Sequence, residues 1–197
     1  MQKYNVISID PPWQQKAGRK IDSYKKVGGK QIFNTSTNKT LNLPYNTLTV
    51  EQIQSVNIGE LAADDCDLYV WVTNAYLPKV FAIIEAWGFR YSTTIVWAKN
   101  MFGGGLGGAF KINTEFLIYA KKGNLKALTT HKGTWFNIKR TYVNGYPKHS
   151  TKPTFFYELI EKISPGKKLE IFARNTRIGW DCFGNEVAST APVTINS

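Results

Sequence analysis

The chain has few of the residues that build metal sites and disulfide frameworks. It contains 2 cysteines and 2 histidines among 197 residues. Cys66 and Cys182 lie far apart, and no Cys-x-x-Cys occurs, so we expect reduced thiols and no metal cofactor. No apolar run is long enough to cross a membrane, and the first residues lack the apolar stretch of a signal peptide. A cytoplasmic protein without membrane contacts is therefore expected.

Acidic residues are also scarce. The 14 Asp and Glu are set against 25 Lys and Arg, which gives a net charge of +11. Much of the excess lies in segments 14–30 and 121–152, and both regions contain or adjoin aromatic residues. Basic residues interleaved with rings indicate a nucleic acid whose bases are gripped by stacking; a basic surface that only aids solubility is the alternative. The predicted nucleic-acid contacts are Lys16, Arg19, Lys20, Lys25, Lys26, Lys139, Arg140 and His149.

An acidic double-proline turn follows the first apolar run. Tyr4–Ile9 is predicted to be a buried strand, and Asp10-Pro11-Pro12-Trp13 ends it. Because proline has no backbone N–H, the turn should present bare carbonyl oxygens beside the Asp10 carboxylate. These acceptors suit the exocyclic amine of a planar base, on which Trp13 or a nearby aromatic would stack. The alternative is a strand-ending turn in which Trp13 merely packs.

The rest of the pattern alternates strands with helices. Thr49–Gln52 forms a capping box that should open a helix to about Ile58, and Val80–Trp87 keep helical spacing up to Gly88. A helix should begin at Pro153 and stop before Pro165. Apolar strands between helices predict an α/β sandwich with a largely parallel sheet. We expect one domain over residues 1–187, a loose tail over 188–197, and strands at 68–72, 93–98, 115–120 and 168–172.

A glycine-rich segment, Gly103–Gly108, satisfies the G-x-G-x-x-G pattern of dinucleotide-binding proteins. That motif needs a helix directly after it, because the phosphates bind at the helix N-terminus. Residues 111–120 are instead predicted to form a strand. The segment is therefore expected to be a flexible loop.

Several separate motifs together resemble those of the MT-A family of adenine-N6 methyltransferases, typified by the S-adenosylmethionine-binding subunit of the mRNA-methylating complex. Besides the Asp10–Trp13 turn they are Thr114–Gly123, His149–Pro153, Leu169–Arg174 and Gly184–Glu186, in the family's order. The resemblance extends from Val6 to Val187. It implies a Rossmann-like methyltransferase fold of permuted order, with the acidic turn first, the cofactor-binding strand last, and helices on both faces of the sheet.

The resemblance also implies a site and a reaction. Asp10, Pro11, Pro12 and Trp13 would hold the target adenine, with Asp10 also near the methionine ammonium of S-adenosylmethionine. Lys152 would meet the cofactor carboxylate and Arg174 the ribose, and the other implied cofactor contacts are Phe172, Asn175, Asn185 and Glu186.

The implied reaction is direct methyl transfer to the N6 amine of adenine in nucleic acid, with DNA favoured over RNA. A catalytically silent relative that binds nucleic acid or scaffolds a partner is the alternative. Whether the chain works with a protein partner or as a homodimer is open at this point.

Overall fold

The computed structural model of the chain describes residues 2–14, 46–99, 109–140 and 151–195. It also describes the backbone of two antiparallel strand pairs. One pair joins β2 (Lys20–Val27) to β3 (Lys30–Ser36), and the other joins β8 (Tyr142–Val143) to β9 (Tyr146–Pro147).

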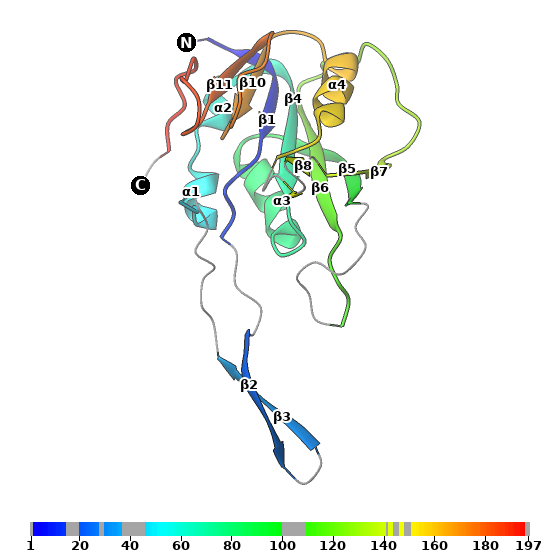
Figure 1. Ribbon diagram of the computed structural model, residues 1–197. Coiled ribbons are helices and arrows are strands. Elements are labelled where there is room, and N and C mark those ends of the chain that lie inside the picture. The colour runs from blue at the N-terminus through cyan, green and yellow to red at the C-terminus, as the bar shows by residue number, and fades with distance from the viewer. Residues whose placement is uncertain are drawn as a thin grey trace.

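A seven-stranded sheet forms the centre of the molecule, in the order β11-β10-β1-β4-β6-β5-β7 (Figure 1). Strand β6 runs antiparallel to both of its neighbours, and the remaining pairings in this sheet are parallel. The prediction of a largely parallel sheet is confirmed. The strands are β1 (Tyr4–Ile9), β4 (Ala62–Val72), β5 (Arg90–Lys99), β6 (Thr114–Lys122), β7 (Trp135–Ile138), β10 (Lys168–Ile171) and β11 (Trp180–Phe183).

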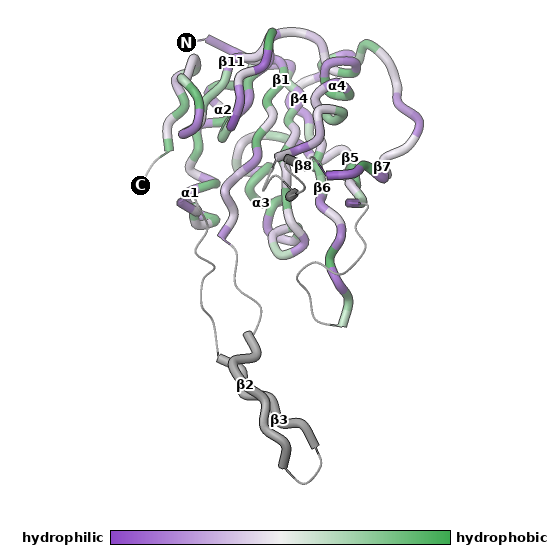
Figure 2. The backbone as a smooth tube through the Cα atoms, in the orientation of Figure 1, coloured by the Kyte–Doolittle hydropathy of each residue, from purple (hydrophilic) through white to green (hydrophobic). Residues whose placement is uncertain are grey.

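Helices cover both faces of the sheet, as expected. Helices α1 (Val50–Gln54), α2 (Ile58–Leu61) and α3 (Leu77–Ala86) lie on one face, and α4 (Thr154–Ile163) lies on the other. Alternate residues of β4 enter the two cores, because successive side chains of a strand point to opposite faces. The helices themselves mix hydrophilic and hydrophobic residues, as Figure 2 shows.

The two cores are distinct in composition. Leu68 and Val70 pack with α1–α3, whereas Tyr69 and Trp71 pack with Phe156 of α4. In the described part of the chain, no helix combines the length and hydropathy needed to span a bilayer.

Local signals set most of the helix ends. The Gln52 backbone N–H donates to Thr49 Oγ1 at 3.2 Å, and the Gln52 side chain accepts from the Thr49 N–H at 2.9 Å, which confirms the capping box. Gly88, with φ of 82°, follows α3 as predicted. The first helix ends at Gln54 rather than near Ile58, because the chain turns at Ser55 and starts α2 at Ile58.

The prediction of a loose C-terminal tail is wrong for residues 188–195. The Thr190 N–H donates to the Cys182 carbonyl at 2.8 Å, and the Thr194 N–H donates to Asn57 Oδ1 at 2.9 Å. Val193 is buried in the core formed with α1–α3. Burial of this apolar side chain therefore helps to fix a segment that was expected to be loose.

The glycine-rich segment Gly103–Gly108 lies outside the described residues. The chain enters strand β6 at Thr114 and forms no helix across the described residues 109–122. This agrees with the prediction that the G-x-G-x-x-G pattern is not followed by a helix here.

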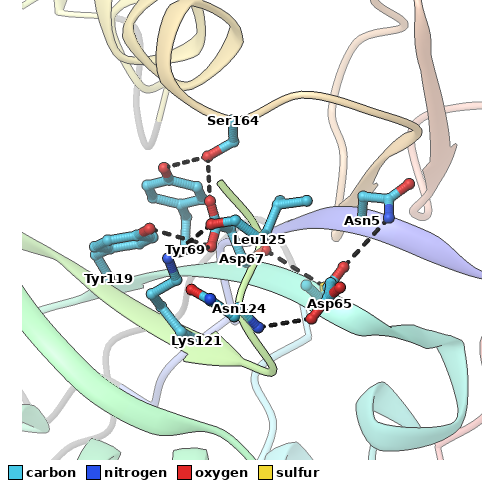
Figure 3. Close-up of polar contacts among 10 residues, drawn as sticks. Asn5, Asp65, Asp67, Tyr69, Tyr119, Lys121, Asn124, Leu125 and Ser164 are labelled. Atoms are coloured by element: carbon cyan, nitrogen blue, oxygen red, sulfur yellow. Dashed lines mark hydrogen bonds and ion pairs between the residues drawn. The ribbon is translucent and has the colours of Figure 1, made fainter. Parts of the chain in front are cut away.

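A buried polar cluster fastens the end of α4 to the sheet (Figure 3). Asp67 on β4 is fully buried, and it accepts hydrogen bonds from Ser164 Oγ at 2.6 Å and from the Tyr119 hydroxyl at 3.1 Å. The Tyr69 hydroxyl pairs with Ser164 Oγ at 2.8 Å. Burial raises the pKa of Asp67 above its usual 3.8, although the Ser164 bond opposes the rise. Each partner is thereby held in one position in the interior.

Candidate active site

The carboxyl ends of β1 and β10 bring the first and last motifs of the sequence together. Asp10 directly follows β1, and its backbone N–H donates to the Ile171 carbonyl at the end of β10 (3.3 Å). Parallel neighbouring strands end at the same edge of a sheet, which is where ligands bind in this class of fold. A pocket opens here between the two strand ends and the start of α4.

Five of the predicted site residues line this pocket, so the structure assembles what the sequence only placed in order. They come from both ends of the chain: Asp10, Lys152, Phe172, Arg174 and Asn175. Phe172 takes a left-handed backbone conformation with φ of 62°, unusual for a residue with a side chain. Such conformations recur at functional sites, where the surrounding structure holds them in place.

Lys152 is the centre of a chain of ion pairs. Its Nζ lies 2.9 Å from Asp10 Oδ2 and 3.3 Å from Glu115 Oε2, and Glu115 pairs in turn with Lys99. The Lys152 side chain is only 7% exposed and its Nζ sits 5.2 Å from the centre of the Trp71 ring. This arrangement balances two partly buried carboxylates with two cations that are largely buried.

The ion pairs decide the charge states at the site. Burial alone would lower the pKa of Lys152, but the Asp10 and Glu115 carboxylates outweigh it and raise that pKa. Burial raises the pKa of Asp10, while Lys152 opposes the rise. Burial would also raise the pKa of Glu115, but Lys152 and Lys99 hold it below its usual value. Lys152 therefore stays protonated, and it lies beside the Asp10 carboxylate, which is largely shielded from water.

The double-proline turn differs from its prediction in its carbonyls, and its Trp13 packs, as the alternative interpretation expected. The Pro11 carbonyl accepts from the Trp13 N–H at 2.8 Å, and the Pro12 carbonyl accepts from the Leu48 N–H at 3.0 Å, so neither is bare. Trp13 is 4% exposed, stacks on Tyr76 at 4.8 Å, and donates its Nε1–H to the Trp71 carbonyl at 2.9 Å. Trp13 thus packs and holds the turn, because one of its ring faces is covered by Tyr76.

Asn185 and Glu186 lie at the border of the site rather than in the pocket lining. Both are exposed, and Glu186 reaches the pocket through Arg174, whose guanidinium lies 3.6 Å from Glu186 Oε1. Gly184 allows this approach. A Cβ at that position would lie 2.1 Å from the Ala173 carbonyl oxygen, so a larger residue would push the turn away from β10.

Sequence reasoning missed the other residues that line the pocket. Three are threonines, Thr151, Thr154 and Thr176, and three have side chains that can ionise: Tyr157, Glu170 and Arg177. The Tyr157 hydroxyl donates to Glu170 Oε1 at 2.5 Å, and the Arg177 guanidinium lies 4.1 Å from the centre of the Tyr157 ring. Burial raises the pKa of Glu170, and the Tyr157 bond opposes the rise. A lone acid inside an apolar strand was the available signal, because a buried carboxylate needs a partner.

Only part of the predicted nucleic-acid contacts can be placed. Lys16, Arg19 and His149 lie outside the described residues, and Lys20, Lys25 and Lys26 are described only as backbone of β2. Lys139 and Arg140 directly follow β7, whose Ile138 is paired with Lys99 at the end of β5. Burial lowers the pKa of Lys99, and the Arg140 charge adds to this. The end of β7 is therefore close to the edge that carries the pocket.

The pocket combines several charges of both signs. Asp10 and Glu170 provide acceptors, while Lys152, Arg174 and Arg177 provide donors. Such a lining can hold a ligand that carries both an ammonium and a carboxylate. Within the described ranges, no group of three His, Cys, Asp or Glu residues is arranged to hold a metal ion.

Comparison with known proteins identifies the group to which this arrangement belongs. The model of the MT-A70 family matches residues 4–186. The chain belongs to the MT-A70 family. The predicted resemblance is confirmed. As an MT-A70 protein the chain is an enzyme, a methyltransferase.

Named relatives of this MT-A70 protein include bacterial and animal enzymes. It is 31% identical to the type II methyltransferase M.MunI of Mycoplasma sp over 94% of this chain and 78% of that protein. It is 27% identical to the human N(6)-adenosine-methyltransferase catalytic subunit METTL3, and 29% identical to the human N(6)-adenine-specific methyltransferase METTL4. These alignments cover 94% and 93% of the chain but only 28% and 37% of the human proteins.

Proposed function

We propose that this MT-A70 protein transfers a methyl group from S-adenosylmethionine to the N6 amine of adenine in nucleic acid. The observation that carries the proposal is the pocket in which Asp10 and Lys152 are paired at 2.9 Å. It lies where the carboxyl ends of β1 and β10 meet, and two relatives over the same stretch of chain are named an N(6)-adenosine-methyltransferase subunit and an N(6)-adenine-specific methyltransferase.

The residues present fit the proposed cofactor. An amino-acid end with an ammonium and a carboxylate matches Asp10 and Lys152, and a ribose matches the Arg174 and Glu186 pair. The buried Thr151 hydroxyl lines the pocket and has no hydrogen-bond partner among the described residues, so a bound ligand would satisfy it. S-adenosylmethionine supplies an electrophilic methyl group on a sulfonium.

The protein's part in the reaction is to orient the target amine and stabilise charge on it. Asp10 Oδ2 is held by Lys152, which leaves Oδ1 to accept an N–H of the adenine amine. The Pro11 carbonyl accepts from Trp13 through one lone pair and keeps a second for the other N–H. Both acceptors favour a pyramidal nitrogen and stabilise the positive charge that develops on it. A target within a duplex must first leave its stack.

DNA is the proposed substrate in preference to RNA. The chain covers 78% of the relative named a type II methyltransferase, but only 28% of the human adenosine methyltransferase subunit. The longer relatives thus contain much that is not matched here. A compact substrate-binding surface built from the chain's own basic segments suits this proposal.

Labelled methyl transfer tests the proposal directly. The purified protein would be incubated with S-adenosylmethionine carrying a labelled methyl group and with adenine-containing DNA and RNA, single-stranded and duplex. Nucleoside mass spectrometry should find N6-methyladenine in DNA. Asp64→Asn, an exposed acid distant from the pocket lining, is the matched control for Asp10→Asn. Label on another atom, or no label with any substrate, would contradict the proposal; label confined to RNA would reverse the choice of substrate.

A further inference from the structure

One tryptophan differs from the other five in its surroundings. Trp13, Trp71, Trp87, Trp97 and Trp180 are between 1% and 8% exposed, whereas Trp135 on β7 is 62% exposed. Burying an indole in a core is normally favourable, so a largely exposed indole indicates a role other than packing. Trp135 is therefore the one tryptophan of the six whose ring is not buried in a core.

The position of Trp135 within β7 keeps the ring outside. Strand β7 is an edge strand of the sheet, beside β5 (Figure 1). Its Phe136 points inward, where it packs against Phe155 and Phe156 at 5.0 and 5.9 Å. Because side chains alternate along a strand, Trp135 and Asn137 face the other way, and both are exposed. Burying Trp135 would require the strand to shift by one residue and expose Phe136.

The same face leads to positive charge at the pocket edge. Lys139 follows two residues after Asn137 and is exposed, and Arg140 comes next, near the buried Lys99. Lys99 itself is linked through Glu115 to Lys152. An exposed ring, an amide and a lysine thus follow one another toward the pocket.

We propose that the outward face of β7, formed by Trp135 and Asn137, together with Lys139 just after the strand, is the track on which a nucleic-acid strand lies as it enters the pocket. Trp135 stacks on a base beside the target, and Lys139 contacts the backbone. Rings that stack bases next to cations that follow phosphates are the pattern of single-strand binding. A neutral or basic protein partner would gain nothing from the lysine. This inference rests on the proposed function, since it supplies the docking surface for the same pocket.

Trp135 also provides the measurement. As the exposed indole of the protein, it is the one whose fluorescence acrylamide should quench readily in the free protein. Adding a single-stranded, adenine-containing DNA oligonucleotide should quench that emission by stacking and protect the ring from acrylamide. Trp135→Phe should remove the signal and keep most of the affinity, because a phenyl ring still stacks. Trp135→Ala should weaken binding roughly 5- to 100-fold.

Two controls separate stacking from general damage. Leu128→Ala removes another exposed apolar side chain, 65% exposed and bonded through its N–H to Ile163 at the far end of α4, so its binding should match the parent. Lys139→Gln should flatten the slope of log affinity against log salt by about 0.7. Equal affinity for the parent and Trp135→Ala would overturn the proposal. So would a ring that is already shielded in free protein at high concentration, since a second copy would then cover it.

The outcome is independent of whether methyl transfer is seen. Binding is measured with S-adenosylhomocysteine present and needs no turnover. Oligonucleotide binding through Trp135 without any methylation would support the track and contradict the proposed function. Methylation that is insensitive to Trp135→Ala at limiting substrate would support the proposed function and contradict the track.

Discussion

Asp67 on β4 is fully buried and Asp10, directly after β1, is partly buried, yet these two carboxylates lie in opposite kinds of surroundings. Val6 of β1 is paired with Asp67 of β4, so Asp10 is four residues, about 13 Å, further along the sheet. Asp67 is bonded to neutral hydroxyls from Ser164 and Tyr119, with Lys121 more distant at 3.9 Å. Asp10 is bonded to the Lys152 cation and borders a pocket.

The difference shows how one fold separates scaffold from chemistry. The Asp67 cluster joins β4 and β6 to the C-terminal end of α4 (Figure 3). The Ser164 and Tyr119 hydroxyls donate hydrogen bonds to the Asp67 carboxylate, so its acceptors are satisfied by the protein itself. Asp10 and Lys152 hold each other in place but still border open space at the other end of α4. A saturated cluster stabilises one arrangement, whereas a cluster with unused acceptors is available to a ligand. The variants below are ordered by the size of the effect expected from this contrast.

The largest effect is expected for Asp10→Ala. Loss of a preorganised acceptor at a developing charge typically costs about a hundredfold or more in rate, so methyl transfer should fall by at least that factor. The fold should persist, because Lys152 keeps Glu115 as a partner. Asp67→Asn is the matched control, which should keep its rate at a temperature where it is folded. Activity of Asp10→Ala within a few-fold of the parent would show that Asp10 is no more important for the reaction than Asp67.

Lys152→Ala should weaken cofactor binding by about 1–3 kcal/mol, because a buried polar contact to the ligand is lost. It should also move the acid limb of the pH–rate profile upward. Lys152 opposes the rise in the pKa of Asp10, so removing it raises that pKa further. Calorimetry with S-adenosylhomocysteine and rates from pH 5 to 9 are the measurements. Unchanged affinity together with an unmoved limb would show that Lys152 is only a structural cation.

Ser164→Ala should act on stability and spare turnover. It leaves the buried Asp67 carboxylate and Tyr69 hydroxyl each short of a partner, so the free energy of unfolding should fall by about 1–3 kcal/mol. Denaturant titration measures the loss, and the rate of the folded enzyme should match the parent. Ser55→Ala, a hydroxyl beside α1, is a control expected to cost less. A Ser164→Ala enzyme that is fully stable but slow would place the cluster among the functional residues.

The smallest effect is a pH dependence carried by Asp67. Its pKa is raised in the folded protein, so the folded state holds the proton more tightly than the unfolded chain. The stability of the parent relative to Asp67→Asn should therefore decline as the pH rises from about 3.8 through the raised pKa, and stay constant above it. Unfolding curves of both proteins from pH 4 to 8 give the difference. A difference that grows with pH would mean that the Ser164 and Tyr119 bonds outweigh burial.

Much of the fold followed from local patterns. The Thr49 capping box, Gly88 and Pro153 marked helix ends, since each acts through hydrogen bonds or backbone conformation within a few residues. The short strands β7 and β11 went unpredicted, whereas β10, which is equally short, was predicted. The packing of the tail was missed because Val193 and the hydrogen bonds of Thr190 and Thr194 join it to residues distant along the chain.

Sequence reasoning predicted several residues of the candidate site but not the contacts between them. Asp10, Lys152 and Arg174 were placed together through the order of motifs, but the role of Glu115 as the second partner of Lys152 was not foreseen. Glu115 comes from β6, and nothing in its own segment indicates which lysine it will meet. For Trp13 the sequence left two interpretations open, stacking on a base or packing, and in the structure its ring stacks on Tyr76.

The sequence by itself determined the alternation of strands and helices, the acidic turn after β1, the basic segments and the family, because each depends on neighbouring residues or on motif order. Only the tertiary structure decided which charges are paired, that Trp135 is exposed while five other tryptophans are buried, and that Asp67 is saturated while Asp10 borders a pocket. The physical reason is that burial and ion pairing depend on residues distant along the chain, which strand order and register bring within a few ångströms of each other.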